Sequence, residues 1–178
     1  MEVYLVRHTE TVCEKGVCYG QSDVKIMEPY DTSFQSIMKQ LPQDARLYSS
    51  PLLRCVLLAN YIKNNSEITE VYQDSRLMEM NFGDWEMKKW DVIEPEELNP
   101  WMTDFVNVRI SNGESFTDLH KRVVHFINNE LKTGISKPVI IVAHAGVIRS
   151  FLCKITNLPL KDAFANKVDF GAVIKIEL

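Results

Sequence analysis

The stretch Val139-Ile140-Ile141-Val142-Ala143-His144-Ala145-Gly146 decides the fold class of this 178-residue chain. Its first five residues are all apolar, which is typical of a strand that is buried on both faces of a parallel sheet. Lys137-Pro138 ends the connection before the strand, and residues 146–156 are predicted to form the helix that follows it. The polar residue at the junction between strand and helix is His144.

The same succession of strand and helix is visible on both sides of this stretch. A buried strand is expected at the N-terminus, and an edge strand is expected at the C-terminal end. Strands that alternate with helices predict a three-layer α/β/α sandwich with a mostly parallel central sheet. We expect residues 1–178 to form a single domain, in which residues 77–114 are a cap over the site. The predicted strands are 2–7, 46–49, 68–73, 139–143 and 169–178, and the predicted helices are 31–41, 51–64, 115–132 and 146–156.

Basic and imidazole side chains follow three of the predicted strands. Arg7-His8 ends the first strand, Arg54 lies in the first turn of the helix that begins at Ser50-Pro51, and His144 ends the strand quoted above. Ligands of open α/β sheets bind outside the carboxyl ends of the strands, so we expect these side chains to converge. Guanidinium groups match phosphate oxygens, and a neutral imidazole is a nucleophile toward phosphorus. The pattern predicts a phosphate site.

Composition limits the function classes. Charged residues make up 25% and hydrophobic residues 46% of the chain, as in a globular domain, and the net charge is −4. A basic field is therefore absent, and we expect no nucleic-acid partner. The apolar runs are far shorter than the roughly 20 residues of a membrane span, and no secretory signal is recognised at the N-terminus. Four scattered cysteines then indicate free thiols and a cytoplasmic protein.

Other phosphate chemistries lack their motifs. The sequence contains no Walker A motif, no cysteine followed six positions later by arginine, and no D-x-D motif. It also contains no H-E-x-x-H metal motif. His120 and His125 are five residues apart on a predicted helix and point about 140° away from each other, so they are not expected to share a metal.

Five blocks of the sequence, in order, resemble the histidine phosphatase superfamily, also called the phosphoglycerate mutase-like family. The resemblance covers nearly the whole chain. The blocks are Leu5-Val6-Arg7-His8-Thr9-Glu10-Thr11, Ser49-Ser50-Pro51-Leu52-Leu53-Arg54, the segment 77–86, Gly113-Glu114-Ser115, and the segment 142–149.

The resemblance implies a two-step phosphoryl transfer without metal or cofactor. His8 would take the phosphoryl group, while Arg7, Arg54 and His144 would bind its oxygens. Glu79 would protonate the leaving oxygen and then activate water. Glu86 and Glu10 are nearby in the sequence and could also act as the general acid. The sequence alone therefore does not decide which of the three carboxylates has this role.

Within the superfamily, residues 18–24 resemble the corresponding segment of alpha-ribazole phosphatases, which act in cobalamin synthesis. This resemblance implies a small phosphorylated metabolite as partner, with Gln21 in the substrate pocket. Glu14 stands where mutases commonly have a phosphate-contacting asparagine, and we expect it to repel a second anionic group. A phosphoglycerate mutase, a broad-specificity sugar phosphatase and a non-catalytic phosphate-sensing module remain alternatives.

Three further positions depart from the superfamily pattern. Thr9 and Met87 stand where glycine is usual, and Asn112 replaces a frequent proline. A β-branched residue at position 9 would be strained if the backbone there required a positive φ.

Overall fold

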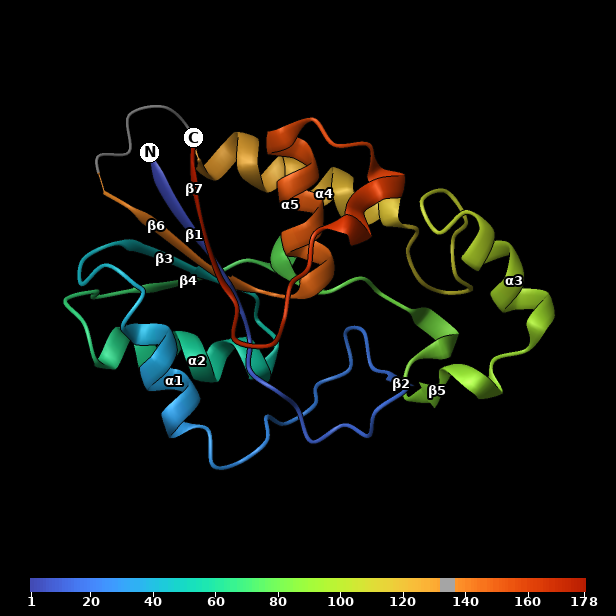
Figure 1. Cartoon of the computed structure of the whole chain (residues 1–178), viewed down its shortest axis with the longest axis horizontal. Coiled ribbons are helices and arrows are strands. Elements are labelled where there is room, and N and C mark those ends of the chain that lie inside the picture. Colours follow the sequence, from blue (N-terminus) through green and yellow to red (C-terminus); the bar gives the residue numbers. More distant parts are fainter. Residues whose placement is uncertain (132–136) are drawn as a thin grey trace.

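A five-stranded sheet forms the centre of the molecule, in the computed structural model that describes residues 1–131 and 137–178 (Figure 1). The strand order is β4-β3-β6-β1-β7, with β7 antiparallel to β1 at one edge and the other pairs parallel. The predicted mostly parallel sheet is therefore confirmed. The strands are β1 (Glu2–Arg7), β3 (Arg46–Ser49), β4 (Val71–Gln73), β6 (Val139–Ala143) and β7 (Val173–Glu177).

Helices cover both faces of this sheet, which makes the three layers (Figure 1). Strand β6 shows why, since successive side chains of a strand point to opposite faces. Ile140 and Val142 pack with the helix pair on one face, and Ile141 and Ala143 pack with the pair on the other. The first pair is α1 (Asp31–Met38) and α2 (Leu53–Asn64), and the second pair is α4 (Phe116–Glu130) and α5 (Ala145–Thr156).

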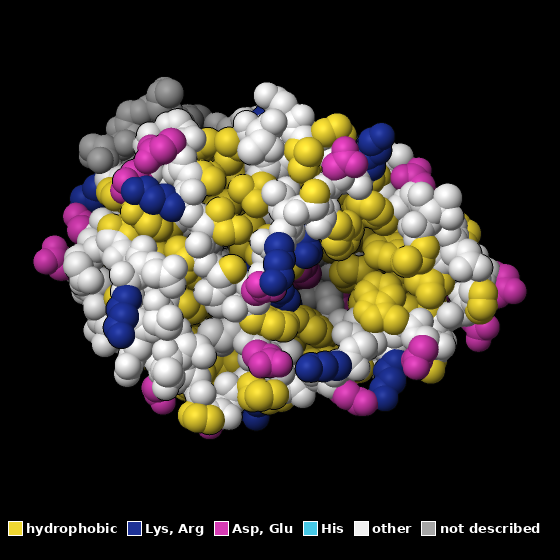
Figure 2. All heavy atoms as spheres, in the orientation of Figure 1, with side chains coloured by type: hydrophobic (Ala, Val, Ile, Leu, Met, Phe, Trp, Pro, Cys, Tyr) yellow, Lys and Arg dark blue, Asp and Glu magenta, His cyan; other side chains and the backbone are white. Residues whose placement is uncertain are grey.

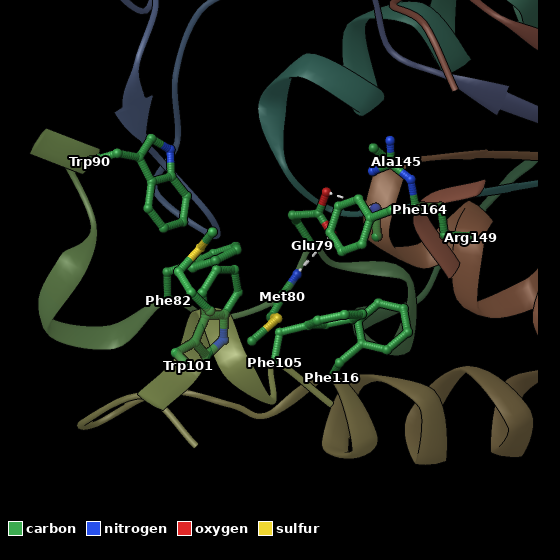
Figure 3. A pocket seen from close by; sticks show the side chains of 12 residues that line it. Glu79, Met80, Phe82, Trp90, Trp101, Phe105, Phe116, Ala145, Arg149 and Phe164 are labelled. Atoms are coloured by element: carbon green, nitrogen blue, oxygen red, sulfur yellow. Dashed lines mark hydrogen bonds between the residues drawn. The ribbon is translucent and has the colours of Figure 1, made fainter. Parts of the chain in front are cut away.

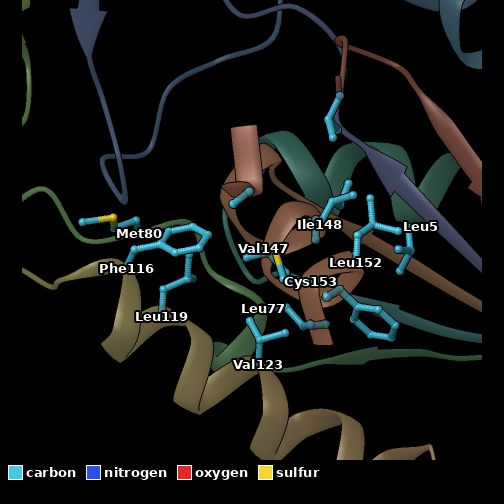
Figure 4. Packing of buried hydrophobic residues seen from close by; sticks show 14 of the residues in the cluster. Leu5, Leu77, Met80, Phe116, Leu119, Val123, Val147, Ile148, Leu152 and Cys153 are labelled. Atoms are coloured by element: carbon cyan, nitrogen blue, oxygen red, sulfur yellow. The ribbon is translucent and has the colours of Figure 1, made fainter. Parts of the chain in front are cut away.

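The core under α4 and α5 is the larger of the two apolar clusters (Figure 4). Leu119 and Val123 of α4 and Val147 and Ile148 of α5 are almost completely inaccessible to solvent. A capping box starts α4, in which Ser115 and Asp118 each accept the other's backbone N–H. Burial of this kind stabilises a fold by about 25 cal/mol for each Å² of apolar surface removed from water.

Several helices and strands are shorter than the sequence predicts. The first helix ends at Met38, α4 ends at Glu130, and β4 and β7 begin later than the sequence suggests. Residue 132, the predicted end of α4, lies outside the described residues. The helix after β3 begins at Leu53 rather than at Pro51, and Ser50 is not its N-cap. The free N–H of Leu53 is satisfied by Asp23 Oδ1 at 2.8 Å, a tertiary contact that local sequence cannot reveal.

Residues 77–114 extend away from the sheet beside the carboxyl ends of its strands (Figure 1). They contain the helix α3 (Pro95–Thr103) and the strand β5 (Lys88–Lys89), which pairs with β2 (Val17–Cys18). The two-stranded sheet is not predicted by the sequence, because its strands are only two residues long. Among the residues described, no helix has the length and apolar character needed to cross a membrane.

Backbone conformation accounts for two of the departures from the superfamily pattern. Met87 and Asn112 have φ angles of 63° and 56°, in the left-handed region that favours glycine and asparagine. Proline has a fixed negative φ, so it could not adopt the conformation found at Asn112. Thr9 is not among the non-glycine residues with positive φ in the described chain, so the β-branched side chain there is not strained in this way.

Candidate active site

Four side chains meet at the carboxyl ends of β1, β3 and β6, as predicted: Arg7, His8, Arg54 and His144, here called the Arg–His cluster. Parallel pairing aligns Arg7 of β1 with Ala143 of β6, so His8 and His144 come next on adjacent strands. Their ring centroids are 5.2 Å apart. The sheet therefore brings together residues that are more than 130 positions apart in the sequence.

His8 is held so that one ring nitrogen stays available. Its Nδ1 lies 2.8 Å from the carbonyl oxygen of Thr9, which accepts a hydrogen bond when Nδ1 carries the proton. The Nε2 lone pair is then free for attack on phosphorus. Thr9 orients His8 through its backbone, and a threonine serves that purpose as well as a glycine.

Burial and nearby cations keep both imidazoles neutral. His8 is only 2% exposed, and its pKa is lowered to about 3, first by burial and then by the positive charges of Arg54 and Arg7. Burial also holds the pKa of the His144 side chain well below its usual value, and His8 and Arg54 add to this effect. The His8 ring is therefore neutral at neutral pH, and a proton on Nδ1 leaves the lone pair on Nε2.

Arg54 is a cation that is completely buried. Its Nη2 and Nη1 donate to the carbonyl oxygens of Gly20 and Ser22 at 2.6 and 2.9 Å, and its Nε donates to His144 Nδ1 at 3.3 Å. No carboxylate pairs with it in the part of the chain that the structure describes. A buried charge without a counter-ion is costly, and an anionic ligand would relieve that cost.

Arg7 is less buried and lies against the loop before β7. Its Nη1 donates to the carbonyl oxygen of Val168 at 2.7 Å, and its guanidinium carbon lies 3.7 Å from the ring centroid of Phe170. Its buried Nε has no hydrogen-bond partner among the described residues. Such a donor is one that a phosphate oxygen can satisfy.

Glu79 lies at the edge of the Arg–His cluster. Its carboxylate accepts the N–H of Met80 at 2.9 Å and the N–H of Gly146, in the first turn of α5, at 3.1 Å. A Cβ at position 146 would collide with Glu79 Oε1, so a larger residue there would displace the Glu79 carboxylate. The backbone around Glu79 is fixed by Arg122, which donates to the Glu79 carbonyl oxygen at 2.9 Å and pairs with Glu114.

The other two acids are placed differently. Both oxygens of Glu86 are occupied by donors from residues 21, 22 and 82. Glu10 is exposed, whereas Glu79 lines the cavity described below. Of the three, Glu79 is the carboxylate best placed to exchange a proton with a ligand.

Gln21 and Glu14 are each held by a neighbouring residue. Gln21 is not among the residues that line the cavity beside Glu79, and its Nε2 donates to the carbonyl oxygen of Glu79 at 2.9 Å, so its place in the substrate pocket stays a prediction. Glu14 is exposed and pairs with Lys89 Nζ at 2.7 Å. Its charge is therefore largely offset, which weakens the argument that it repels a second anion.

A cavity of about 480 Å³ opens beside Glu79, and half of the residues that line it are aromatic (Figure 3). Figure 2 shows hydrophobic side chains gathered around a hollow on this side of the molecule. Most of the lining comes from residues 79–116, and Ala145, Gly146, Arg149 and Phe164 complete it. We call it the aromatic cavity; its aromatic residues are Phe82, Trp90, Trp101, Phe105, Phe116 and Phe164.

Two polar groups stand out in the aromatic cavity. Trp101 is 8% exposed, and its indole Nε1–H has no partner among the described residues. The guanidinium of Arg149 lies over Phe164, with its carbon 4.8 Å from the ring centroid, and Nε donates to the carbonyl oxygen of Asn166 at 3.2 Å. Neither residue is among the site residues predicted from the sequence, although Arg149 lies in the matching segment 142–149, three positions after Gly146 in a helix, which places it near Glu79.

Two guanidinium groups and two neutral histidines meet at the carboxyl ends of the strands of an α/β/α sandwich, with the carboxylate of Glu79 nearby, which is the arrangement expected of a phosphate site. The model of the histidine phosphatase superfamily (branch 1) matches residues 3–178. The chain belongs to this superfamily, and its similarity over nearly the whole chain to members named phosphatases supports a phosphoric monoester hydrolase.

The names of related proteins refer to more than one substrate. The chain is 26% identical over 185 residues to the adenosylcobalamin/alpha-ribazole phosphatase of Salmonella typhimurium, covering 100% of this chain and 91% of that protein. It is 27% identical over 166 residues to phosphoserine phosphatase 1 of Hydrogenobacter thermophilus, covering 90% and 78%. The crystal structure of the alpha-ribazole phosphatase from Shigella flexneri superposes with a TM-score of 0.90 at 24% identity, covering 100% and 91%, which shows the shared fold.

Proposed function

We propose that the protein hydrolyses a phosphomonoester through a phosphohistidine on His8, without a metal. The His8 Nε2 lone pair attacks phosphorus while the bond from phosphorus to the leaving oxygen breaks, and Glu79 gives that oxygen its proton. Water then attacks the phosphohistidine as Glu79 takes a proton back, the P–N bond breaks, and inorganic phosphate leaves. The observation that carries the proposal is a buried His8 kept neutral between two arginines.

Arg7, Arg54 and His144 stabilise the transferring phosphoryl group in this proposal. Phosphoryl transfer depends on positioning and on charge stabilisation, which preorganised donors in a buried site supply well. The unpartnered Nε of Arg7 and the buried, unpaired charge of Arg54 are the features that support this role. Residues 77–114 act as the cap of the site, since they supply most of the aromatic cavity.

For the substrate, we propose a small metabolite whose leaving group carries a planar aromatic ring, with alpha-ribazole 5′-phosphate first. Aromatic rings stack with a gain of about 0.5–1.5 kcal/mol beyond their buried area. The free indole N–H of Trp101 favours a leaving group with a hydrogen-bond acceptor, such as a ring nitrogen or a ribose oxygen. The similarity to an alpha-ribazole phosphatase points the same way.

Arg149 favours a second candidate. A cation inside the aromatic cavity can bind the carboxylate of phosphoserine, and a phosphoserine phosphatase is among the relatives. The same carboxylate argument applies to 3-phosphoglycerate, the substrate of the mutase alternative.

The test compares kcat/KM for these three phosphomonoesters in EDTA at fixed ionic strength. We expect alpha-ribazole 5′-phosphate to exceed phosphoserine and 3-phosphoglycerate by at least about tenfold, which corresponds to one aromatic contact of about 1.4 kcal/mol. A preference for either carboxylate substrate would overturn the substrate proposal and leave the phosphohistidine chemistry standing. Phosphate binding with no hydrolysis of any phosphomonoester would instead identify a phosphate-sensing module.

A further inference from the structure

Glu86 holds a short loop through four hydrogen bonds. Its Oε1 accepts from the backbone N–H of Gln21 at 2.8 Å and of Phe82 at 3.1 Å. Its Oε2 accepts from the backbone N–H of Ser22 at 2.7 Å and from the Ser22 hydroxyl at 2.5 Å. One carboxylate thus fixes both the loop of residues 20–22 and the start of the turn that carries Glu86 itself.

The opposite side of this loop faces Arg54. The carbonyl oxygens of Gly20 and Ser22 accept from the Arg54 guanidinium at 2.6 and 2.9 Å. The loop therefore turns its N–H groups toward Glu86 and two of its carbonyl groups toward Arg54. Gly20 makes this close approach feasible: its φ is 42°, and a Cβ at this position would collide with Glu86 Oε1.

These contacts leave Arg54 with two free donors. A guanidinium has five N–H groups, and three are used by Gly20, Ser22 and His144. The two carbonyl groups determine how the guanidinium plane is turned, and so where its remaining N–H groups point. Because Arg54 has no carboxylate partner among the described residues, this indirect arrangement is what orients it.

We propose that Glu86 is a positioning residue, which fixes the phosphoryl-binding orientation of Arg54 through the loop 20–22 and takes no part in proton transfer. The proposal rests on the proposed function, in which Arg54 binds the transferring phosphoryl group. Its consequence is specific: loss of Glu86 weakens every step that involves the phosphoryl oxygens, whatever leaving group is attached. Loss of Glu79 acts on the leaving oxygen, and so depends on the leaving group.

The experiment measures kcat/KM for p-nitrophenyl phosphate, phenyl phosphate and an alkyl phosphate, together with inhibition by vanadate. In Glu86→Gln, an amide N–H₂ group replaces one carboxylate oxygen. It cannot accept from the N–H and O–H donors that face it, so two of the four hydrogen bonds are lost. We expect kcat/KM to fall by about 10- to 100-fold, by the same factor for all three substrates, as is typical for groups that orient ligands at metal sites. The vanadate inhibition constant should rise in parallel.

Two variants serve as references. Asp84→Asn makes the same acid-to-amide change in the same turn, on an exposed side chain that bonds only Asn112 among the residues described, and it should match the wild type. Ser22→Ala removes one donor and keeps the Glu86 carboxylate, so it should give a smaller, equally uniform loss. Ser22→Ala also provides the answer if Glu86→Gln does not fold, as judged by circular dichroism.

Each result has one meaning. A loss in Glu86→Gln that grows with the basicity of the leaving group would make Glu86 an acid and overturn the proposal. A Glu86→Gln protein that behaves like Asp84→Asn would also overturn it. If the wild type shows no hydrolysis, the proposed function fails, and calorimetric binding of inorganic phosphate to the same variants still tests whether Glu86 orients Arg54.

Discussion

The Arg–His cluster and the aromatic cavity lie side by side, yet the chain builds them in different ways. Arg7, His8 and His144 are at or just after the carboxyl end of a strand, and Arg54 lies in the first turn of the helix that follows β3. Most of the aromatic cavity comes from residues 79–116, which lie outside the sheet. The proposed reaction is thus placed at the ends of the sheet strands, and the proposed choice of substrate in a segment outside the sheet.

The largest loss of activity is expected from a substitution in the Arg–His cluster. His8→Ala should lower kcat/KM by roughly 10⁴-fold or more for every phosphomonoester, as for other nucleophiles of covalent catalysis. The leaving group should not matter, because the attacking nitrogen is gone. Thermal unfolding followed by circular dichroism should show an intact fold. Substantial turnover by this variant would remove His8 from the mechanism.

Glu79, which lies beside the Arg–His cluster and lines the aromatic cavity, should show an effect that depends on the substrate. Glu79→Gln keeps the size of the side chain and removes its proton. We expect kcat/KM for an alkyl phosphate to fall by about 10²- to 10⁴-fold, and that for p-nitrophenyl phosphate far less, because kcat/KM reports the steps up to loss of the leaving group and nitrophenolate leaves without a proton. Equal losses in kcat/KM on both substrates would move the acid to another carboxylate.

An effect of intermediate size concerns the pH dependence of stability. The pKa of His8 is lowered to about 3 in the folded protein, whereas an unfolded histidine titrates near 6.5. Below pH 6.5 the unfolded state therefore binds more protons, and the free energy of unfolding falls as the pH drops toward 3.

Urea unfolding of the wild type and of His8→Gln between pH 4 and 7 isolates this contribution. The free energy of unfolding of the wild type should decrease more steeply than that of the variant, by a difference approaching about 1.4 kcal/mol per pH unit. Equal slopes in the two proteins would mean that His8 is not held neutral by the fold.

The smallest effect belongs to the aromatic cavity. Trp101→Phe keeps an aromatic ring and removes the unpartnered Nε1–H. We expect kcat/KM for alpha-ribazole 5′-phosphate to fall by about 2- to 13-fold, which corresponds to one hydrogen bond of 0.5–1.5 kcal/mol. Phenyl phosphate has no acceptor on its leaving group beyond the ester oxygen and should be unaffected. A loss of the same size for both would show that the N–H contacts neither leaving group.

The sequence predicts the Arg–His cluster but not the aromatic cavity. The apolar run at 139–143 and the residues after each strand are local signals, so the layers, the parallel sheet and the meeting of Arg7, His8, Arg54 and His144 follow from them. The start of α2 depends on Asp23, a contact between segments 30 residues apart. No local pattern contains such a contact, and the predicted start was wrong for that reason.

The aromatic cavity was equally hidden from the sequence. Its residues come from loops, short turns and three helices, so no single periodicity marks them. Gln21 and Glu86 illustrate the same limit: both stand in the matching segments, and only their hydrogen bonds show that they hold the site together. Whether a polar side chain faces a ligand or a carbonyl oxygen is decided by tertiary packing.

Trapping of the phosphoenzyme tests the central claim most directly. Wild-type protein is mixed with a radiolabelled phosphomonoester in EDTA and quenched in denaturant within milliseconds. The account predicts a label that is stable to alkali, released by acid, located by peptide mapping to His8, and lost in His8→Ala. A label on another residue, or full turnover with no labelled protein at any time point, would contradict it.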